Sequence, residues 1–309
     1  MHFPDRALPA ALPATRWLRA DDPDWPPLWR VLDVPPPAVH ACGVTDALAR
    51  PCLGIVGTRS ASPRGLAVAR DLARRLAAAG WVITSGLARG IDAAAHKGAL
   101  DAGGLTVAVM ATGNDGCYPY AHRGLLAQVR AHGCSITQFR PGTPPLKHHF
   151  LQRNELLAGL VHGVIVVEAP TDSGALDTAR RALNAGREVF AVPGPVDVES
   201  SRGCHQLLRE GACLVEKAED VLNVLGAPDR TGLLTADAAR AAAAPALPDH
   251  AAARWLWDRL DLGGAGRDEL RRQWPGDEHG FVEGLTALEL AGLIRRLPGG
   301  RLARRLWPG

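Results

Sequence analysis

The segment of residues 52–96 constrains the fold of this chain more than any other stretch. Residues 52–56 form a short apolar run that predicts a buried strand, and the glycine turn Gly57-Thr58-Arg59-Ser60 follows it. A second apolar run, residues 81–84, leads into a second glycine turn at Ser85-Gly86. Between the two runs, leucine and alanine recur at helical spacing. This strand–helix–strand pattern predicts an open parallel sheet, in which such turns line up at the carboxyl edge where ligands bind.

The residues around the two turns have the chemistry of anion-binding loops. Ser62 and Pro63 have the residue types of a helix N-cap and first helical position, and Gly80 has that of a C-cap. Backbone N–H groups at such a helix N-terminus bind anions, and Arg59 adds several donors suited to a phosphate. The alternative is that the glycines only form turns and that Arg59 is a solvated surface residue. The predicted phosphate-binding residues are Gly57, Thr58, Arg59, Ser62, Ser85, Gly86, Arg89 and Gly90.

Two nucleotide-binding signatures are absent from the sequence. There is no G-x-x-x-x-G-K-[ST], so nothing indicates a P-loop ATPase, and the first turn follows G-x-x-G and not G-x-G-x-x-G. A dinucleotide fold also places an acid near the end of the second strand, where Ser85-Gly86 stands. The sequence therefore predicts neither a bound dinucleotide nor another cofactor.

Further strand–helix units follow this segment. Four more apolar runs predict strands of a parallel sheet that is buried on both faces, at residues 105–110, 134–139, 164–167 and 187–192. Ser173 and Gly174 begin the helix after the third of these runs. They add another helix N-terminus with donors for an anion at the same edge of the sheet.

A long proline-rich loop, residues 141–150, carries the start of the pattern Lys147-x-x-Phe150-x-x-Arg153-Asn154. Long ordered loops tend to be functional. Cations bind the phosphates of a single nucleic-acid strand and an aromatic ring stacks on a base, which is worth about 1–3 kcal/mol. These residues therefore have the types that a single nucleic-acid strand requires. The alternative is that Phe150 belongs to the core and that Lys147 is a solvated loop charge.

Three motifs carry a resemblance to a known family. GIVGTRSASPRG, SGLARGIDAAAHKGAL and REVFAVPG, in this order, are similar to motifs of the DNA-processing protein A family, DprA or Smf. The resemblance covers residues 22–225 strongly and the C-terminal part more loosely. It implies an α/β fold with an extended Rossmann-like core that binds single-stranded DNA and has no catalytic activity. It also implies a homodimer that protects incoming DNA and loads the RecA recombinase onto it during natural transformation.

The resemblance also implies roles for particular residues. The family's arginine after the first glycine turn, with a lysine and a phenylalanine further on, contacts DNA; these match Arg59, Lys147 and Phe150. Glu155 stands where the family usually has an arginine. A carboxylate beside a phosphate track is repulsive, so we expect Glu155 to turn away or to pair with a neighbouring arginine. The resemblance further implies a dimer interface, with ordinary core packing as the alternative, at His205, Leu208 and Leu214.

Outside the core, the sequence predicts three further parts. Residues 1–21 are rich in Pro and Ala and predict a poorly ordered start, before an arm that packs on the sheet and opens the core domain of residues 22–225. Residues 226–250 have the composition of a linker. Residues 251–309 predict a winged-helix domain with a basic cluster that suits weak phosphate contact or protein docking. The cluster comprises Arg295, Arg296, Arg301, Arg304 and Arg305. The predicted helices of this domain lie near residues 255–260, 268–274 and 281–296, ahead of a small hairpin.

Composition bears on the remaining function classes. The 309 residues carry a formal net charge of only +3, so any basic surface is local. Six cysteines without a C-x-x-C pair predict buried thiols and no metal site, and the lack of a signal peptide or transmembrane run predicts a cytoplasmic protein. A second hypothesis for the function, beside single-stranded DNA binding, is a nucleotide-binding or nucleotide-hydrolysing Rossmann-like enzyme or sensor. Glu168 or Asp92 would then be its acid or base.

Overall fold

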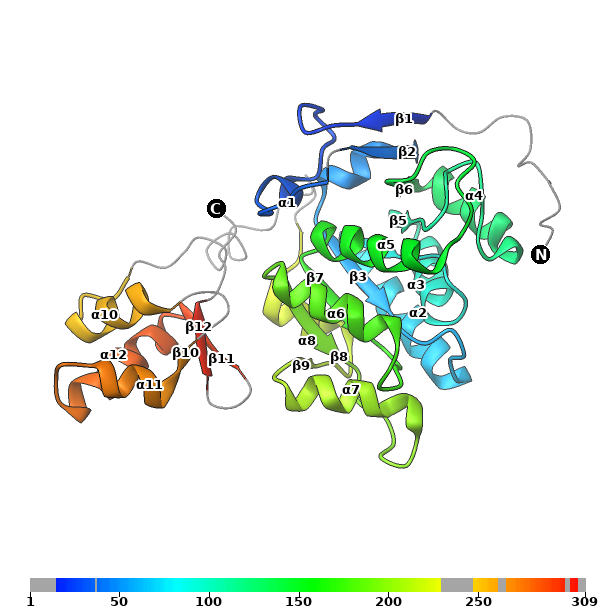
Figure 1. The fold of residues 1–309 in the computed structure, drawn as a ribbon. Helices are drawn as coiled ribbons and strands as arrows, with labels where there is room; N and C mark the ends of the chain where they lie inside the picture. The colour runs from blue at the N-terminus through cyan, green and yellow to red at the C-terminus, as the bar shows by residue number, and fades with distance from the viewer. Residues whose placement is uncertain (1–14, 37, 229–246, 261–264, 298–300, 305–309) are drawn as a thin grey trace. The chain divides into compact units, whose positions relative to one another are not determined.

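The structure, a computed structural model, describes residues 15–36, 38–228, 247–260, 265–297 and 301–304. The chain divides into two compact units. One comprises residues 1–208 with 212–234, and the other residues 209–211 with 235–309. The first unit holds a large sheet and the second a small one (Figure 1).

A nine-stranded sheet forms the centre of the first unit, counted over its described residues. Its strands are β1 (Thr15–Leu18), β2 (Val39–Gly43), β3 (Cys52–Val56), β4 (Val82–Ser85), β5 (Thr106–Val109), β6 (Gly133–Thr137), β7 (Gly163–Val166), β8 (Glu188–Ala191) and β9 (Cys213–Leu214). Their order is β1-β2-β6-β5-β4-β3-β7-β8-β9. Strands β3 to β9 pair in parallel, whereas β1 pairs with β2, and β2 with β6, in antiparallel register.

Helices cover both faces of this sheet, as the side chains of β3 indicate. Leu53 and Ile55 are buried on one face and Cys52 and Val56 on the other. The face of Leu53 packs against α2 (Pro63–Ala78), α3 (Ile91–Asp101), α4 (Arg123–Ala131) and α8 (Ala218–Leu225). The face of Cys52 packs against α1 (Pro27–Arg30), α5 (Lys147–Leu160), α6 (Gly174–Asn184) and α7 (Glu199–Arg209), of which α5 and α6 lie in front in Figure 1. Two 3₁₀ turns, η1 (Thr45–Ala49) and η2 (Tyr120–His122), complete the unit's described helical segments.

The strand order reverses direction between β3 and β7. From β3 the chain adds β4, β5 and β6 on one side, and β7, β8 and β9 then extend the sheet on the other. In an open α/β sheet, ligands bind outside the carboxyl ends of the strands at such a switch point. The first glycine turn follows β3, and Glu168 follows β7, so both reach this position.

The predicted helix and strand ends around the first turn are confirmed. β3 has the predicted limits, and Ser62 is the N-cap of α2, because its Oγ accepts a hydrogen bond from Gly65 N at 3.0 Å. Gly80 follows the end of α2 with a φ of +99°, a conformation that favours glycine. Caps and short apolar runs are local signals, which is why the sequence predicts them well.

The N-terminal part is more ordered than predicted. Within the predicted poorly ordered start, residues 15–18 form β1, while residues 1–14 lie outside the described residues. β1 pairs with β2, a strand that the sequence analysis missed, and buries Leu18. This pairing is a tertiary contact that no short window of sequence reveals. The arm was predicted to be extended and to pack on the sheet; Trp25, Leu28 and Trp29 are buried as expected, but residues 27–30 form the short helix α1 and are not extended.

Two further predictions of local structure are wrong. The predicted loop over residues 141–150 ends at Leu146, and Lys147 already begins α5. The third helix of the C-terminal region, α12 (Glu278–Leu290), stops before the predicted residue 296. Gly292 has a φ of +67° just after it, and the chain continues as strand β11 (Ile294–Leu297). The apolar residues that extended the predicted helix belong instead to this strand.

The second unit has its own apolar core. Over its described residues, α10 (Ala251–Arg259), α11 (Arg267–Gln273) and α12 accompany a three-stranded sheet of β10 (Ala265–Gly266), β12 (Arg301–Arg304) and β11. Leu256, Phe281 and Leu288 lie at the centre of its core. Arg304 belongs to the predicted basic cluster. Its Cζ lies 4.5 Å from the centroid of the Trp257 ring, and its Nε donates a hydrogen bond to the backbone oxygen of Trp257. The winged-helix assignment stays a prediction, and most of the predicted linker lies outside the described residues.

The six cysteines are free thiols; four of them are buried, as expected, whereas Cys117 and Cys213 are only half-buried. Burial raises the pKa of Cys52 and of Cys204 to about 12, so both stay protonated and unreactive near neutral pH. Within the described part of the chain, no group of His, Cys, Asp and Glu is arranged to hold a metal ion. None of the described helices combines the length and the apolar character that crossing a membrane requires.

Candidate nucleic-acid interface

A cation and two aromatic rings meet at the carboxyl edge of the sheet. Arg59, which is exposed, lies over the ring of Phe150 with its Cζ 5.0 Å from the ring centroid. Tyr118, 43% exposed, packs edge-on against the same ring at a centroid distance of 5.7 Å. Phe150 is half-buried and so presents part of its ring to solvent. We call Arg59, Tyr118 and Phe150 the ring cluster.

The first turn of α5 brings a second cation to this cluster. Lys147 is the first residue of α5 and stands three positions before Phe150, so the two side chains lie on the same helix face. Lys147 is exposed. The structure therefore brings together the three residues that the resemblance singled out, Arg59, Lys147 and Phe150. The sequence analysis did not include Tyr118 in the predicted site. The available signal was an aromatic residue just after a glycine.

The two glycine turns lie against each other, as predicted. Ile91 N donates a hydrogen bond to Thr58 O at 3.3 Å. A Cβ on Gly90 would lie 2.3 Å from Thr58 O, and one on Gly57 would lie 2.5 Å from Ile91 Cγ1. Gly90 also has a φ of +75°. Glycine at both positions therefore permits the close approach of the turns, and Arg59 and Arg89 project from them into solvent.

The carboxylate of Glu168 occupies the N-terminus of α2. Its two oxygens accept hydrogen bonds from Ser62 N at 2.9 Å and from Ser62 Oγ at 2.5 Å, while Thr58 N donates to the Glu168 carbonyl at 2.7 Å. A negative group at this position complements the helix dipole. These two donors of Ser62 thus already have a partner in the protein, and the predicted contact of Ser62 with a phosphate stays a prediction.

A second carboxylate, that of Asp92, fills the other glycine turn. Asp92 Oδ2 accepts from Gly86 N at 3.1 Å and from Ala88 N at 3.3 Å, and lies 3.8 Å from Arg153 Nη1. A Cβ on Gly86 would lie 1.1 Å from that guanidinium nitrogen, so glycine at this position leaves the room that the end of the Arg153 side chain occupies. Ser85 is buried and donates to Ile55 O at 2.6 Å. Burial raises the pKa of Asp92, and the neighbouring Arg153 acts in the opposite direction.

Burial also corrects the roles predicted for Arg153 and Asn154. Arg153 is only 6% exposed and Asn154 is 7% exposed, so neither can reach a strand on the surface. Asn154 Nδ2 donates to Gly174 O at 3.3 Å and to Asp177 Oδ2 at 3.1 Å, which joins α5 to α6. Ser85, Gly86, Arg153 and Asn154 are thus internal supports of the edge and not contacts on it.

The N-terminus of α6 lies at the predicted place. Ser173 is its N-cap and accepts from Leu176 N at 3.4 Å, and Gly174 is exposed. One of the two expectations for Glu155 is confirmed, because its carboxylate pairs with Arg181 Nη1 at 3.0 Å. This pairing partly neutralises a charge that would otherwise repel phosphate.

His96 serves a structural role inside the first unit. Its Nδ1 lies 2.7 Å from Thr106 Oγ1, which in turn donates to Ile83 O at 2.7 Å. Because the hydroxyl proton is used in that way, Nδ1 of His96 carries the proton and donates. Burial lowers the pKa of His96 to about 3, so the ring is neutral near pH 7.

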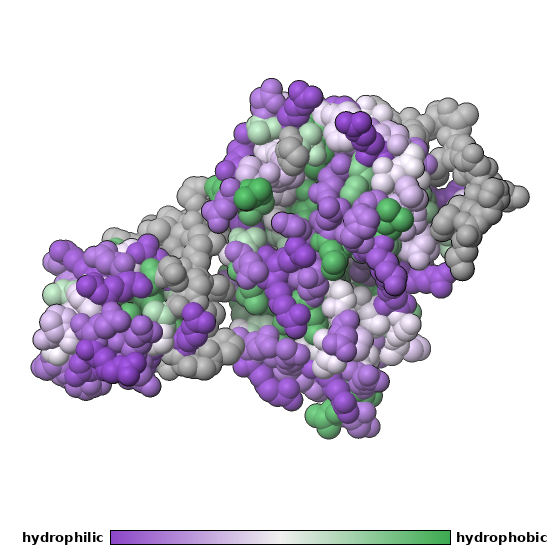
Figure 2. All heavy atoms as spheres, in the orientation of Figure 1, coloured by the Kyte–Doolittle hydropathy of each residue, from purple (hydrophilic) through white to green (hydrophobic). Residues whose placement is uncertain are grey.

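Several cations along the edge pair with no carboxylate of the described residues. Arg59, Arg64, Arg89 and Lys147 are exposed, and no carboxylate of the described residues pairs with them. These cations form a local basic surface, which agrees with the small formal net charge of the whole chain. In Figure 2, hydrophobic residues form separate small patches on a face that is largely hydrophilic. A polar, negatively charged ligand suits this edge better than an apolar one.

The three predicted dimer residues lie on two elements, α7 and β9. β9 is the last strand in the sheet order, and its Leu214 is 50% exposed. Leu208 is partly buried against the core, and His205 Nε2 lies 3.0 Å from Gly194 O. Val196, 85% exposed, lies in the loop that leads into α7. Leu214 thus fits an interface better than Leu208, which core packing already explains.

Comparisons with known proteins identify related sequences. A sequence model of a family described as DNA recombination-mediator protein A matches residues 16–226. The putative DNA processing protein DprA of Mycobacterium tuberculosis is 42% identical over 251 residues, which are 74% of this chain and 61% of that protein. Protein Smf of Escherichia coli is 39% identical over 231 residues, which are 73% of this chain and 62% of that protein. The chain thus spans less than two thirds of the length of these relatives.

Two solved structures share the fold. DNA processing protein A from Streptococcus pneumoniae superposes with a TM-score of 0.64 at 40% identity, covering 67% of this chain and 73% of that one. The protein from Helicobacter pylori superposes with a TM-score of 0.61 at 29% identity, covering 68% of this chain and 95% of that one. The second structure is described by its single-stranded DNA binding mode. The predicted Rossmann-like class of the core is confirmed.

Proposed function

We propose, from the premise that this chain belongs to the DNA recombination-mediator protein A family, that its carboxyl sheet edge binds single-stranded DNA. The observation that carries the proposal is the ring cluster, in which an unpaired guanidinium lies 5.0 Å from a half-exposed phenylalanine ring. The description of the Helicobacter pylori relative supports the same ligand class. We further propose that the protein has no catalytic activity of its own.

The edge offers a single strand two kinds of contact. The guanidinium of Arg59 and the ammonium of Lys147 attract phosphates, and the rings of Phe150 and Tyr118 offer surfaces on which bases stack. A duplex keeps its bases stacked inside, so the rings favour a single strand over a duplex. Every base has a stacking face, which makes such binding tolerant of sequence.

Two substitutions separate these contacts. Phe150→Ala should lower the affinity for oligo-dT by about 1–3 kcal/mol, because one stacking surface is lost, and leave the salt dependence unchanged. Lys147→Ala should instead reduce the slope of log affinity against log salt by about one, because one phosphate contact is lost. Fluorescence polarisation titrations at several salt concentrations measure both quantities. Equal effects of the two variants on the slope would contradict the assignment of Phe150 to stacking.

We propose that the bound strand is handed to RecA during natural transformation and that the protein acts as a homodimer through α7 and β9. Leu214→Glu should convert the dimer to a monomer in sedimentation, because it places a charge in the interface. Leu290→Glu, at an 85% exposed position of the second unit, is the control. The rate of RecA assembly on a single strand, with and without the protein, tests loading; an unchanged rate would contradict it.

A nucleotide-binding or nucleotide-hydrolysing enzyme has less support. Asp92 is buried and holds the second turn, and Glu168 holds the N-terminus of α2, so both candidate acids serve structural hydrogen bonds. A thermal shift with a panel of nucleotides, set beside an oligo-dT titration, separates the two functions. Stabilisation by a nucleoside phosphate without any oligo-dT binding would favour the enzyme.

A further inference from the structure

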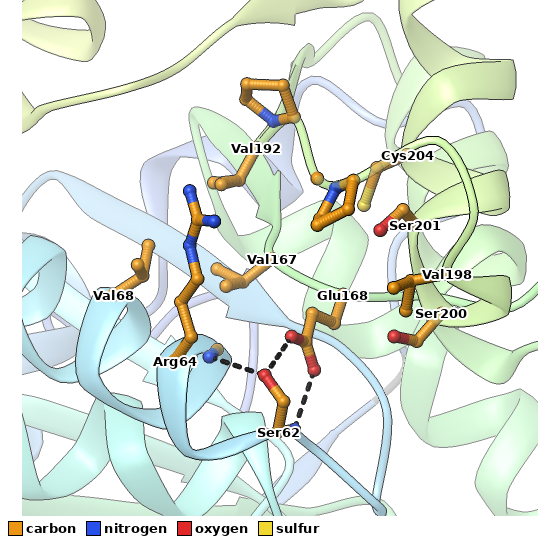
Figure 3. A pocket seen from close by; sticks show the side chains of 14 residues that line it. Ser62, Arg64, Val68, Val167, Glu168, Val192, Val198, Ser200, Ser201 and Cys204 are labelled. Atoms are coloured by element: carbon orange, nitrogen blue, oxygen red, sulfur yellow. Dashed lines mark hydrogen bonds between the residues drawn. The ribbon is translucent and has the colours of Figure 1, made fainter.

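A small cavity opens beside the N-terminus of α2, between that helix and α7. Its volume is about 120 Å³. Figure 3 shows Arg64 extending from α2 on one side, Ser200 and Ser201 of α7 on the other, and Glu168 between them. Much of the remaining wall is apolar, from Val68, Val167, Val192, Pro193, Pro195 and Val198. The volume equals that of roughly four waters at ~30 Å³ each, which suits one ring system and is far below the size of a dinucleotide site.

The polar groups of this cavity have capacity left for a ligand. A carboxylate has about four acceptor positions, and Ser62 uses two of those on Glu168, through its N–H and its hydroxyl. Ser201 is only 3% exposed and lines the cavity, where its hydroxyl can donate to a ligand. Arg64 is unpaired by any described carboxylate. The cavity therefore offers acceptors in its interior, one hydroxyl and one cation.

These groups favour a flat ring that carries N–H donors and a nearby phosphate. Among the bases, guanine has two adjacent donors, at N1 and N2, for the free acceptor positions of Glu168, and a carbonyl to which Ser201 can donate. Thymine has a single N–H between two carbonyl oxygens, which a carboxylate repels. Arg64, in the first turn of α2, stands close in the chain to Arg59 of the ring cluster, so one strand can follow both cations.

We infer that this cavity receives one guanine base of the bound strand, read by Glu168, with its phosphate held by Arg64. This inference rests on the proposed binding of single-stranded DNA and adds one selective position to an otherwise sequence-tolerant site. Enzymes that read an extruded base use the same means, namely hydrogen bonds to its pairing edge and apolar contact with its faces.

The test compares labelled dT oligonucleotides that differ at one central nucleotide. A single dG should raise the affinity about tenfold over all-dT, the order expected of one bidentate base contact. Deoxyinosine, which lacks the N2 amino group, should recover only part of this gain. In Glu168→Gln the ratio of dG to dT affinities should fall to about one, because the amide removes one acceptor. Val198→Phe, which narrows the cavity without touching Ser62, should reduce the same ratio.

Three outcomes would overturn the inference, and they are distinguishable. Equal affinities for the dG and dT oligonucleotides in the unmodified protein would remove the selective position while leaving the proposed function intact. A dG preference that persists in both variants would place the selection elsewhere. Thermal stabilisation by free dGMP, without a dG preference in oligonucleotides, would assign the cavity to a free nucleotide. Failure to bind any oligonucleotide would instead refute the proposed function on which the inference rests.

Discussion

Arg59→Glu should weaken binding of oligo-dT by about a hundredfold or more while the protein stays folded. The substitution removes the cation over Phe150 and sets a carboxylate where the strand's phosphates pass, and like charges brought together cost several kcal/mol. The fold should be retained because Arg59 is exposed and pairs with no carboxylate of the described residues. Fluorescence polarisation measures the affinity, and a thermal melt measures the stability.

Arg50→Glu is the matched control for this variant. Arg50 is exposed and stands just before the start of β3, whereas Arg59 stands just after its end, so the same charge change falls on opposite edges of the sheet. Arg50→Glu should weaken the binding of oligo-dT only slightly, because it changes the overall charge of the protein but not the ring cluster. This small loss should depend on the salt concentration. Equal losses in both variants would mean that net charge, and not the ring cluster, determines binding.

Sequence patterns predicted the parts of the site that are determined by residues close together in the sequence. The apolar run of β3, the N-cap Ser62 and the glycines of the two turns are short-range signals, and the turns meet at one edge because parallel strands end together. The residue types of Lys147 and Phe150 also sufficed to place a cation and a ring on this edge. Their assignment to a loop was wrong, because the hydrogen bond from His149 N to Leu146 O starts a helix after a run of prolines.

The partners of the glycine turns could not be predicted in this way. Ser62 and Glu168 are 106 residues apart in the chain, and only the pairing of β3 with β7 brings them together. Free N–H groups in a glycine turn predict an anion, but the pattern does not say whether that anion is a ligand or a side chain of the protein. Here both turns hold internal carboxylates, so the proposed function assigns the binding of a strand mainly to the cations and rings.

The buried pair of Asp92 and Arg153 connects this edge to the stability of the fold. Asp92 holds two N–H groups of the second turn, and Arg153 covers Gly86 while donating to Val109 O at 3.4 Å. Burial lowers the pKa of Arg153, and the nearby Asp92 carboxylate acts in the opposite direction. Each member of the pair therefore favours the charged form of the other against the effect of burial.

Arg153→Met should lower the free energy of unfolding by about 3–5 kcal/mol at pH 7, because it leaves the Asp92 carboxylate buried without a cation. The loss should shrink as the pH falls. Burial already raises the pKa of Asp92 above its unfolded value, and without Arg153 it rises further, so the folded state takes up a proton first and gains stability at lower pH. Urea unfolding at pH 7 and at pH 5 measures both effects.

A second substitution and a surface control complete this experiment. Adding Asp92→Asn to Arg153→Met should recover much of the stability and remove the added pH dependence, because no buried charge is then unpaired. Arg181→Met removes a half-buried arginine that pairs with Asp177 and Glu155, and should cost only about 1 kcal/mol. If Arg153→Met cost no more than Arg181→Met, or its cost stayed constant between pH 7 and pH 5, Asp92 would not be the charge that Arg153 compensates. The recovery in the double variant matters most, because it separates loss of a charge partner from loss of packing around Gly86.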